Sequence, residues 1–323
     1  MLLSESTDLQ ATRPAIALGL DDVGVTGIVR GILLGAASIA TTATFDVGAT
    51  LGADARGAHM SRFHEAIDHA LALGGADGRD VPSLEVLAGL VAMRAAELQG
   101  SASARATVRA TLAWPRVAPA SGRRTIDPFD AWSTVEVERA TRRTVTTFGV
   151  AATGMTACPC AQTLVRESGI ERLRGAGLDG ETIERALDAL PVATHNQRST
   201  GVLEITVPGD AAVTALAEPI ELADLVRGSM SARIHELLKR DDELAVVEMA
   251  HADPRFVEDC VRALVRDVLE HPTLGSSLPD NAVIAVRQTN HESIHAHDVV
   301  ATRRGTVAAL RAELGVETPP VRA

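Results

Sequence analysis

The segment "PSLEVLAGLVAMRAAELQG" (residues 82–100) has the periodicity of an α-helix and ends at Gly100, a residue type common just past a helix end. The preceding segment "SRFHEAIDHALAL" (residues 61–73) predicts another helix, with Ser61 as its N-cap. Segments rich in Thr, Val and Ile flank this helix pair and predict strands over residues 15–32, 37–47 and 104–114. The first part of the chain therefore predicts two strands, two helices and then further strands.

The second half of the chain repeats that order. Its predicted elements are a strand over residues 200–209, helices over 219–240 and 254–271, and strands over 281–290 and 297–305. Between the halves, residues 134–153 predict either one long strand or a hairpin. Two strands, two helices and two strands, present twice, predict a duplicated α+β unit.

The composition is typical of a soluble globular protein, because 46% of the 323 residues are hydrophobic and 23% are charged. A net charge of −11, with five Phe, two Trp and no Tyr, argues against a nucleic-acid partner, which needs clustered basic charge and stacking rings. No charge-free apolar stretch approaches the roughly 20 residues that span a membrane, and no secretory signal pattern is present. Three cysteines cannot form a disulfide framework, so we expect a cytoplasmic protein without a membrane partner.

Six clusters of polar and reactive side chains are candidates for chemistry. They are "RGAHMSRF" (residues 56–63), "TACPCAQ" (156–162), "THNQRS" (194–199), "KRDDE" (239–243), "FVED" (256–259) and "NHESIHAHD" (290–298). Most of these clusters, taken singly, have ordinary structural explanations as well as functional ones.

Cys158 and Cys160 have several interpretations. A C-x-C pair can be two half-buried residues at a turn, and a redox pair is expected at C-x-x-C spacing instead. A structural zinc site would need a second close pair of ligands, which the sequence lacks. A catalytic metal site needs about three protein ligands and an open position, and its ligands can come from distant segments.

His195 lies on a predicted loop, where a lone histidine is commonly a solvated surface residue. Its neighbours, among them Gln197 and Arg198, form a run of hydrogen-bonding groups of the kind that an anionic or purine ligand requires. His295 and His297 lie between two predicted strands, and alternating geometry predicts that they point to the same side.

Two carboxylates also have ordinary explanations. Glu243 ends a charge run that is expected to be a solvated surface. Glu258 lies in the first turns of a predicted helix, where the helix dipole favours a carboxylate. Cys260, two residues on, is expected to be a core cysteine.

Together the six clusters resemble the metal-dependent GTP cyclohydrolases of type IB and their archaeal-type relatives. That family has the segments HMSRF, CPC, HxQR, KR-x-DE, FVED and ESIH in this order. Here they stand as His59–Phe63, Cys158–Cys160, His195–Arg198, Lys239–Glu243, Phe256–Asp259 and Glu292–His295, over about residues 56 to 298. Six segments in the family's order make the resemblance specific.

The resemblance implies an α+β tunnelling fold, with two ββααββ units per chain and antiparallel sheets backed by helices. We place the units at residues 1–135 and 136–323, the latter carrying most of the metal-site residues. The resemblance also implies a homo-oligomer, expected to be a homotetramer, with active sites at subunit interfaces. It implies that one divalent metal ion is held by Cys158, His195, Glu243 and His295, with Cys160 beside it.

The family chemistry is opening of the guanine imidazole ring of GTP at C8 and release of formate. Thiolate, imidazole and carboxylate ligands suit Zn²⁺, Fe²⁺ or Mn²⁺, and such a metal turns water into hydroxide at neutral pH. Proton transfer is assigned to His295, His297 or His195. Glu258 would accept hydrogen bonds from the guanine N–H edge. The candidates for triphosphate binding are Arg62, Arg198, Lys239, Arg240 and His59.

One departure concerns the product. In typical bacterial members the CPC and HNQRS segments lie close together, whereas 34 residues separate Cys160 from His195 here, including a predicted helix over residues 179–190. The long insert resembles the archaeal type, which makes 7,8-dihydroneopterin 2′,3′-cyclic phosphate, whereas "HNQRS" resembles the bacterial type, which makes 7,8-dihydroneopterin triphosphate.

Two other readings are a nitrile reductase of the same fold, which uses NADPH and a cysteine nucleophile, and a non-enzymatic metal-binding scaffold.

Overall fold

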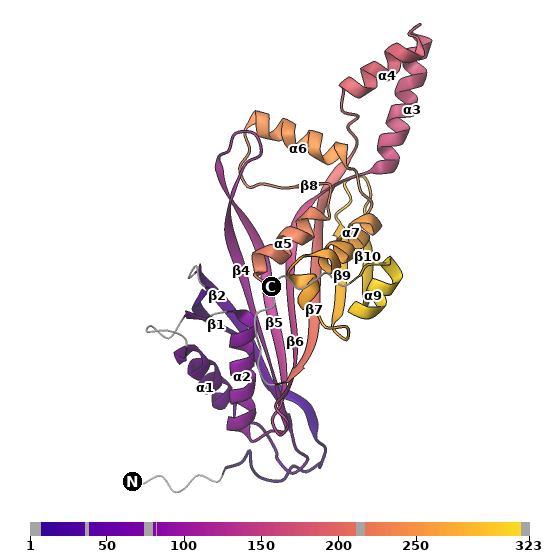
Figure 1. The fold of residues 1–323 in the computed structure, drawn as a ribbon. Coiled ribbons are helices and arrows are strands. Elements are labelled where there is room, and N and C mark those ends of the chain that lie inside the picture. The colour runs from indigo at the N-terminus through magenta and orange to yellow at the C-terminus, as the bar shows by residue number, and fades with distance from the viewer. Residues whose placement is uncertain (1–7, 36–38, 74–79, 82, 211–216, 318–323) are drawn as a thin grey trace. The chain divides into compact units, whose positions relative to one another are not determined.

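The computed structural model describes residues 8–35, 39–73, 80–81, 83–210 and 217–317, which form two compact units (Figure 1). Unit 1 comprises the described residues as far as Leu112, Asp130–Gly149 and a short stretch from Ile205. Unit 2 comprises Ala113–Phe129, Val150–Glu204 and the described residues from Ala217 onward.

Unit 1 contains the first helix pair and the strands around it. Its elements are β1 (Leu20–Leu34), β2 (Ile39–Leu51), α1 (Met60–Ala72), β3 (Asp80–Val81) and α2 (Leu84–Gln99), with parts of β4 (Ser103–Val117), β5 (Arg124–Glu138), β6 (Arg143–Ala157) and β7 (Asn196–Asp210). β2 pairs antiparallel with β1 on one side and with β4 on the other. α1 and α2 pack against each other, α1 against β1 and α2 against β2.

Unit 2 contains the remaining elements. They are the other parts of β4, β5, β6 and β7, with α3 (Pro159–Gly175), α4 (Gly180–Ala189), α5 (Pro219–Gly228), β8 (Ala232–Arg233), α6 (Arg240–Ala252), α7 (Val257–Glu270), α8 (Leu274–Ser277), β9 (Val283–Asn290), β10 (Val299–Thr306) and α9 (Val307–Leu314). The strand order is β10, β9, β7, β6, β5, and β8 pairs with β6. α7 packs on β9 and β10.

Local sequence explains these elements. In β4, Ala104, Ala106 and Val108 are buried while Arg109 is exposed, which is the period of two expected for a strand with one covered face. The side chain of Ser83 caps α2 by accepting a hydrogen bond from the main chain of Val86 at 3.2 Å. α2 ends at Gly100, whose φ of 70° is left-handed backbone that glycine adopts without a steric penalty.

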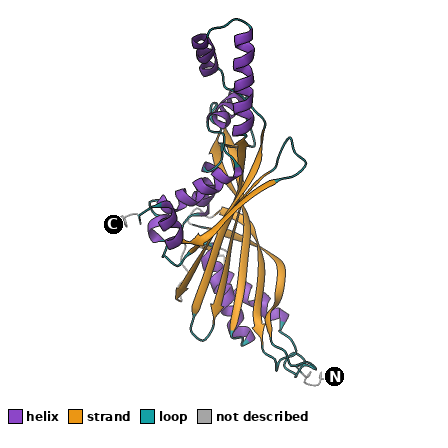
Figure 2. Cartoon of the chain, turned by 90° about the vertical axis from the view of Figure 1, so that its right-hand side faces the viewer, coloured by secondary structure: helices purple, strands orange, loops and turns teal. Residues whose placement is uncertain are grey.

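The prediction of an α+β fold with antiparallel sheets backed by helices is confirmed (Figure 2). The ββααββ order is present twice, as β1, β2, α1, α2, β4, β5 and as β6, β7, α5, α7, β9, β10. α3, α4 and α6 are additions to the second repeat. The predicted boundary after residue 135 falls inside β5, and the assignment of the repeats to residues 1–135 and 136–323 stays a prediction.

The predicted single helix over residues 219–240 is wrong. The chain forms α5, leaves the helix at Ser229, pairs with β6 through β8 and begins α6 only at Arg240. The hydroxyl of Ser231 accepts a hydrogen bond from the main chain of Ala157 at 3.3 Å, next to the strand pairs that β8 makes. These bonds satisfy the backbone in an extended form, which overrides the helical periodicity of the sequence.

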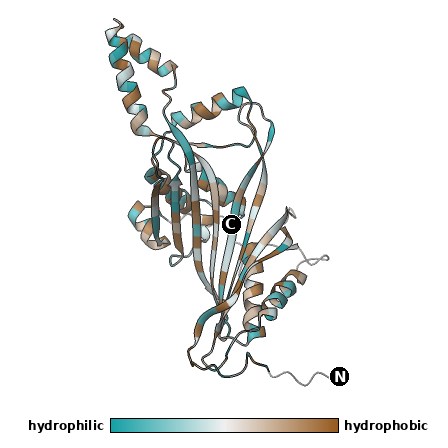
Figure 3. Cartoon of the chain, turned by 180° about the vertical axis from the view of Figure 1, so that it is seen from behind, coloured by the Kyte–Doolittle hydropathy of each residue, from teal (hydrophilic) through white to brown (hydrophobic). Residues whose placement is uncertain are grey.

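The stretch at residues 134–153 is a hairpin. β5 and β6 are joined by a turn in which Arg142 has a positive φ of 57°. The predicted helix over residues 179–190 is present as α4, whereas α3 was not predicted. Figure 3 shows polar and apolar residues interspersed along α3 and α4, which gives α3 no clear apolar face from which to predict a helix.

Candidate functional site

The CPC segment is a strand-to-helix turn in unit 2. β6 ends at Ala157, Cys158 is the N-cap of α3, and Pro159 is its first residue. Proline suits that position because it has no N–H to leave unpaired. The Cys158 sulfur accepts a hydrogen bond from the Ala161 main chain at 3.4 Å, while Cys160 is exposed. The turn therefore holds the first sulfur in place and leaves the second facing solvent.

His195 lies beside this turn. The main-chain N–H of Cys158 donates a hydrogen bond to the carbonyl oxygen of His195 at 3.3 Å. The Nδ1 atom of His195 is buried and has no hydrogen-bond partner among the described residues. A buried ring nitrogen without a partner is uncommon in proteins, and it suits a nitrogen that ligates or accepts a proton.

Gln197 and Arg198 diverge at the start of β7, because successive strand residues point to opposite faces. Gln197 is buried, and its Nε2 donates to the Thr156 hydroxyl at 3.1 Å and to the Glu292 carboxylate at 3.4 Å. Its Oε1 is buried with no partner among the described residues. Arg198 is exposed, and its carbonyl accepts from the His291 main chain at 2.9 Å.

Arg198 lines a hollow of about 540 Å³ within unit 2. Asp127 and His235 also line it, and the Nε2 of His235 is buried without a partner among the described residues. Burial lowers the pKa of His235. A hollow with an exposed guanidinium and a neutral imidazole can receive a polar ligand, which is the chemistry expected around Arg198.

An ion pair that the sequence did not suggest lies next to this hollow. The buried Arg227 guanidinium lies 2.7 Å from the Asp127 carboxylate and donates to the Pro128 carbonyl at 2.9 Å. Burial raises the pKa of Asp127, and the neighbouring Arg227 and Arg116 guanidiniums oppose that rise. The pair joins the beginning of β5 to the end of α5.

His295 and His297 lie in the segment between β9 and β10. Their rings stack, with centroids 5.3 Å apart and planes inclined by 19°, which agrees with the prediction that they point to the same side. Both residues are exposed. The carboxylate of Asp298, next in the sequence, lies 3.1 Å from the Nδ1 of His291.

The KRDDE run begins α6. Lys239 is its N-cap, and Lys239, Arg240 and Glu243 are exposed. The fourth member, Asp242, is buried and accepts hydrogen bonds from the main chains of Ser121 at 2.7 Å and Lys239 at 2.9 Å. The hydrogen bond from the Ser121 main chain, together with those from the main chains of Lys239 and Ala120, holds the pKa of Asp242 far below its usual value. Lys239, Arg240 and Glu243 therefore lie exposed at the start of α6, and the hydrogen bonds of Asp242 hold this helix end in place.

Glu258 lies in the first turn of α7, as predicted, and is exposed. It lines a pocket of about 250 Å³ in unit 2 with the apolar side chains of Val261, Val265 and Leu310. A carboxylate beside an apolar wall can bind the polar edge of a flat ring while the wall contacts its face.

His59 and Arg62 are the two predicted site residues that lie in unit 1. His59 is the N-cap of α1, and its Nε2 lies 3.1 Å from each oxygen of the Asp8 carboxylate. The side chain of Gln99 bonds both the N–H and the C=O of His59, at 3.2 and 2.8 Å. Arg62 is half-buried in the same helix.

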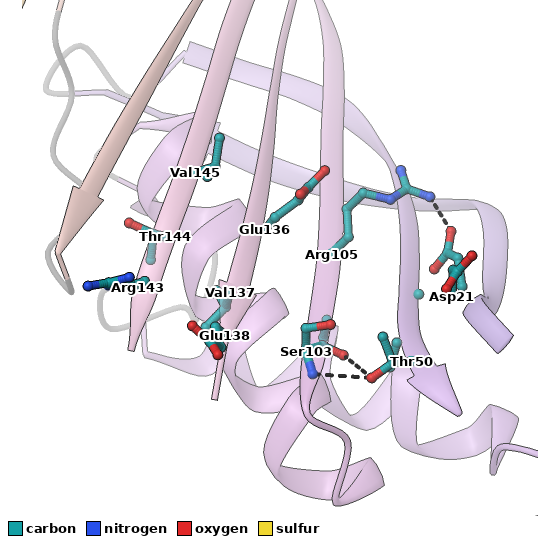
Figure 4. A pocket seen from close by; sticks show the side chains of 14 residues that line it. Asp21, Thr50, Ser103, Arg105, Glu136, Val137, Glu138, Arg143, Thr144 and Val145 are labelled. Carbon is teal, nitrogen blue, oxygen red and sulfur yellow. Dashed lines mark hydrogen bonds and ion pairs between the residues drawn. The ribbon is translucent and has the colours of Figure 1, made fainter. Parts of the chain in front are cut away.

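Unit 1 also has a hollow of about 420 Å³, lined by residues of β1, β2, β4, β5 and β6 (Figure 4). Arg105 forms an ion pair with Asp22 there, and the Thr50 hydroxyl bonds the main chain of Ser103. The described residues that line it include none of the predicted site residues.

The predicted metal ligands are brought together only in part. The structure places Cys158 beside His195, whereas Glu243 is on α6 and His295 in the segment after β9. In the described part of the chain, no three His, Cys, Asp or Glu side chains form a group that could hold a metal ion. The thiol of Cys158 and the unpartnered nitrogen of His195 fit two positions of a mixed sulfur and nitrogen site.

No helix among the described residues is long and apolar enough to cross a membrane.

The family model and the sequence relatives of this chain agree on one family. A family model described as "Type I GTP cyclohydrolase folE2" matches residues 7–301. "GTP cyclohydrolase MptA" of Methanosarcina barkeri (strain Fusaro / DSM 804) is 36% identical over 318 residues, covering 95% of this chain and 96% of that protein. "GTP cyclohydrolase MptA" of Methanoregula boonei (strain DSM 21154 / JCM 14090 / 6A8) is 36% identical over 313 residues, covering 95% and 93%. Among solved structures, a uricase from Bacillus fastidious aligns over 94% of this chain and 99% of that chain, with 9% identity and a TM-score of 0.49.

Proposed function

The chain belongs to the type I GTP cyclohydrolase family and is a hydrolase that acts on GTP, and we propose that it opens the guanine imidazole ring of GTP at C8 to give 7,8-dihydroneopterin triphosphate. One water molecule adds at C8 and the ring opens. A second hydrolytic step then releases that carbon as formate. Rearrangement of the ribose to an open-chain ketone and its condensation with the freed ring amine, with loss of one water molecule, would close the dihydropterin ring. The product would be the first intermediate of folate and pterin biosynthesis.

The observation that carries this proposal is the position of Cys158 beside His195. The two residues belong to segments far apart in the sequence, and both have the ligand types expected of a catalytic metal site. The unpartnered Nδ1 of His195 supports a ligand role. We propose that Glu243 and His295 complete the ligand set, with Cys160 next to it.

A divalent ion held there, Fe²⁺, Mn²⁺ or Zn²⁺, would supply hydroxide at neutral pH and polarise the reacting carbon. Glu258 would accept hydrogen bonds from the guanine N–H edge, with the apolar wall of its pocket against the ring. The stacked imidazoles of His295 and His297 would transfer protons at the ring nitrogens as they leave C8.

The triphosphate would be bound by basic side chains. Arg198, Lys239 and Arg240 are exposed in unit 2, and each can donate to phosphate oxygens. His59 and Arg62 are proposed for the same role, and Gln197 is proposed to contact the substrate. Local clusters of this kind let a protein with a net charge of −11 bind a polyanion.

We propose that the enzyme is a cytoplasmic homotetramer with its sites at subunit interfaces. The side chains of Leu244 and Val247, which follow Glu243 on α6, are 57% and 38% exposed and support contact of this helix with another chain. The molar mass in solution, measured by light scattering after size-exclusion chromatography, tests this part of the proposal.

A second candidate product is 7,8-dihydroneopterin 2′,3′-cyclic phosphate. The observation that favours it is the insert between Cys160 and His195, which folds as α3 and α4 and resembles the archaeal type. Cyclisation would require the 2′-hydroxyl of the dihydroneopterin side chain to attack the α-phosphate carried by the neighbouring 3′-oxygen, with pyrophosphate as the leaving group. Mass spectrometry of the product distinguishes the two candidates.

The test is turnover of GTP by protein stripped of metal and then supplied with Mn²⁺, Fe²⁺ or Zn²⁺. We expect formate and, after oxidation, a fluorescent pterin only in the samples that contain metal. Turnover that does not depend on metal would contradict the metal site. NADPH consumption with a nitrile substrate would instead indicate the nitrile reductase reaction.

A further inference from the structure

The segment that leads into β7, residues 191–195, has no regular secondary structure, yet three of its carbonyl oxygens are held in place. The oxygen of Val192 accepts a hydrogen bond from the Gln162 side chain at 3.0 Å. The oxygen of Thr194 lies 3.2 Å from the Nε2 atom of His251, and the oxygen of His195 accepts from Cys158. This irregular segment is thereby fixed along its length.

Gln162 makes two of the bonds that fasten this region. It lies in the first turns of α3, and its Nε2 donates to the carbonyl of Val192 and also to the carbonyl of His251, at 2.8 Å. Both hydrogens of the amide are therefore used. The bonds tie α3 to the segment that carries His195 and to the end of α6.

The side chain of His251 connects α6 to the same segment, residues 191–195. Its ring is buried at the end of α6, with Nδ1 2.7 Å from the carbonyl of Val247 and Nε2 3.2 Å from the carbonyl of Thr194. Both carbonyl oxygens only accept hydrogen bonds, so the imidazole is the donor in these contacts. Hydrogen bonds thus connect α3 to residues 192–195, these residues to α6, and α6 back to α3.

The helices between Cys158 and His195 provide little packing that would fix the returning chain. α3 buries none of its residues and α4 buries only Ile183. A loop of this length leaves the position of its end undetermined unless specific contacts set it. Pairing of β6 with β7 brings the two ends of the insert together, and the bonds of Gln162 and His251 hold the irregular residues 191–195 that precede β7.

We propose that Gln162 and His251 are positioning residues that hold His195 beside Cys158 in a geometry that binds metal. This inference rests on the proposed function, because it assigns the two residues a role in that site. Outer groups that orient metal ligands typically change metal affinity by about 10- to 100-fold when they are replaced.

The test uses the full chain with Gln162→Met and His251→Phe, which remove the donors while keeping similar volume. His271→Phe is the matched control, because the Nδ1 of His271 also bonds a main chain in unit 2, at Leu274. Two readouts are measured together with thermal stability. One is Co²⁺ affinity from its thiolate charge-transfer absorption, and the other is hydrogen exchange at the Cys158 amide.

We expect both variants to bind Co²⁺ about 10- to 100-fold more weakly than wild type and to exchange the Cys158 amide faster, with the control unchanged in both. Wild-type affinity and wild-type exchange in a folded variant would overturn the inference, whatever the change in Tm. If wild type itself bound no Co²⁺ but the variants exchanged faster, the proposed metal chemistry would fail and the positioning role would stand. If His251→Phe does not fold, the test relies on Gln162→Met, since Gln162 is only half-buried.

Discussion

The Cys158 N–H and the His195 carbonyl oxygen, separated by 36 intervening residues and two helices, form a hydrogen bond of 3.3 Å. The bond joins the end of β6 to the segment before β7, and these two strands are neighbours in the sheet. Strand pairing therefore brings the two segments together, and the helices of the insert leave and return at the same place.

Loss of a proposed metal ligand is expected to abolish both metal binding and turnover. Cys158→Ala and His295→Ala should each lower metal content and reduce GTP turnover by more than about a hundredfold, since even outer-sphere replacements have effects of about 10- to 100-fold. Metal content by mass spectrometry and formate release check this. His69→Ala, which replaces an exposed histidine of α1, is the control. Full activity of His295→Ala would remove His295 from the ligand set.

Replacement of Glu258 is expected to separate substrate binding from metal binding. Glu258→Gln should keep the metal but lower kcat/KM for GTP by about ten- to a hundredfold, because a hydrogen bond to a charged group contributes about 1.5–3 kcal/mol. Steady-state kinetics with metal analysis check the result. Glu167→Gln, an exposed carboxylate on α3, serves as the control. A near-normal KM for GTP in Glu258→Gln would show that Glu258 does not anchor the purine.

The three thiols are expected to differ in reactivity. Burial raises the pKa of Cys260 to about 12, so at pH 8 almost none of this residue is thiolate. Cys160 is exposed and should be alkylated first, while Cys260 should be modified only after unfolding. Iodoacetamide labelling followed by peptide mass spectrometry, with and without denaturant, measures this order. Labelling of Cys260 in the folded protein would contradict its burial.

The Asp242 cap is expected to make stability depend on acid pH. The pKa of Asp242 is lowered in the folded protein, so its contribution is fully present above the unfolded value near 3.9 and is lost as pH falls below it. Asp242→Asn should lower Tm by a few degrees at pH 7, and the difference from wild type should shrink toward pH 3. Thermal unfolding at several pH values checks this. A constant difference at all pH values would rule out the carboxylate as the cause.

Breaking the buried pair of Arg227 with Asp127 is expected to destabilise the protein. Arg227→Ala should lower the free energy of unfolding by about 3 kcal/mol, the low end of the range for a broken buried pair, because among the described residues Asp127 then keeps only the ion pair with Arg116, whose Nε lies 3.7 Å away. Urea denaturation followed by circular dichroism measures the change. Arg262→Ala, which removes an exposed pair with Asp259, should change stability by at most about 1 kcal/mol.

The regular elements could be predicted because their patterns are local. α2 and α7 have their apolar residues at helical spacing, and the alternation in β4 matches its buried face. The break in the predicted helix over residues 219–240 depends on Ser231 bonding Ala157, a contact between segments 74 positions apart. Sequence periodicity contains no information about such a contact.

The sequence predicts which residues belong to the candidate site. It does not predict which residues hold them in position. His195, Glu258 and Cys158 belong to recognisable segments, whereas Gln162 and His251 act through hydrogen bonds to carbonyl oxygens. Any residue can provide a carbonyl, so no pattern in the sequence marks the partner. A glutamine two residues after the C-x-C segment was the available signal for Gln162.

The hairpin of α3 and α4 has a consequence for how this chain can evolve. With Ile183 as the single buried residue in its two helices, selection for stability acts weakly on most of its positions. Substitutions can therefore accumulate there without loss of the folded core, as long as the ends of the hairpin keep their bonds. A new recognition surface can therefore evolve on the insert with little effect on the stability of the enzyme. A reporter domain can likewise be inserted between Ala176 and Asp179.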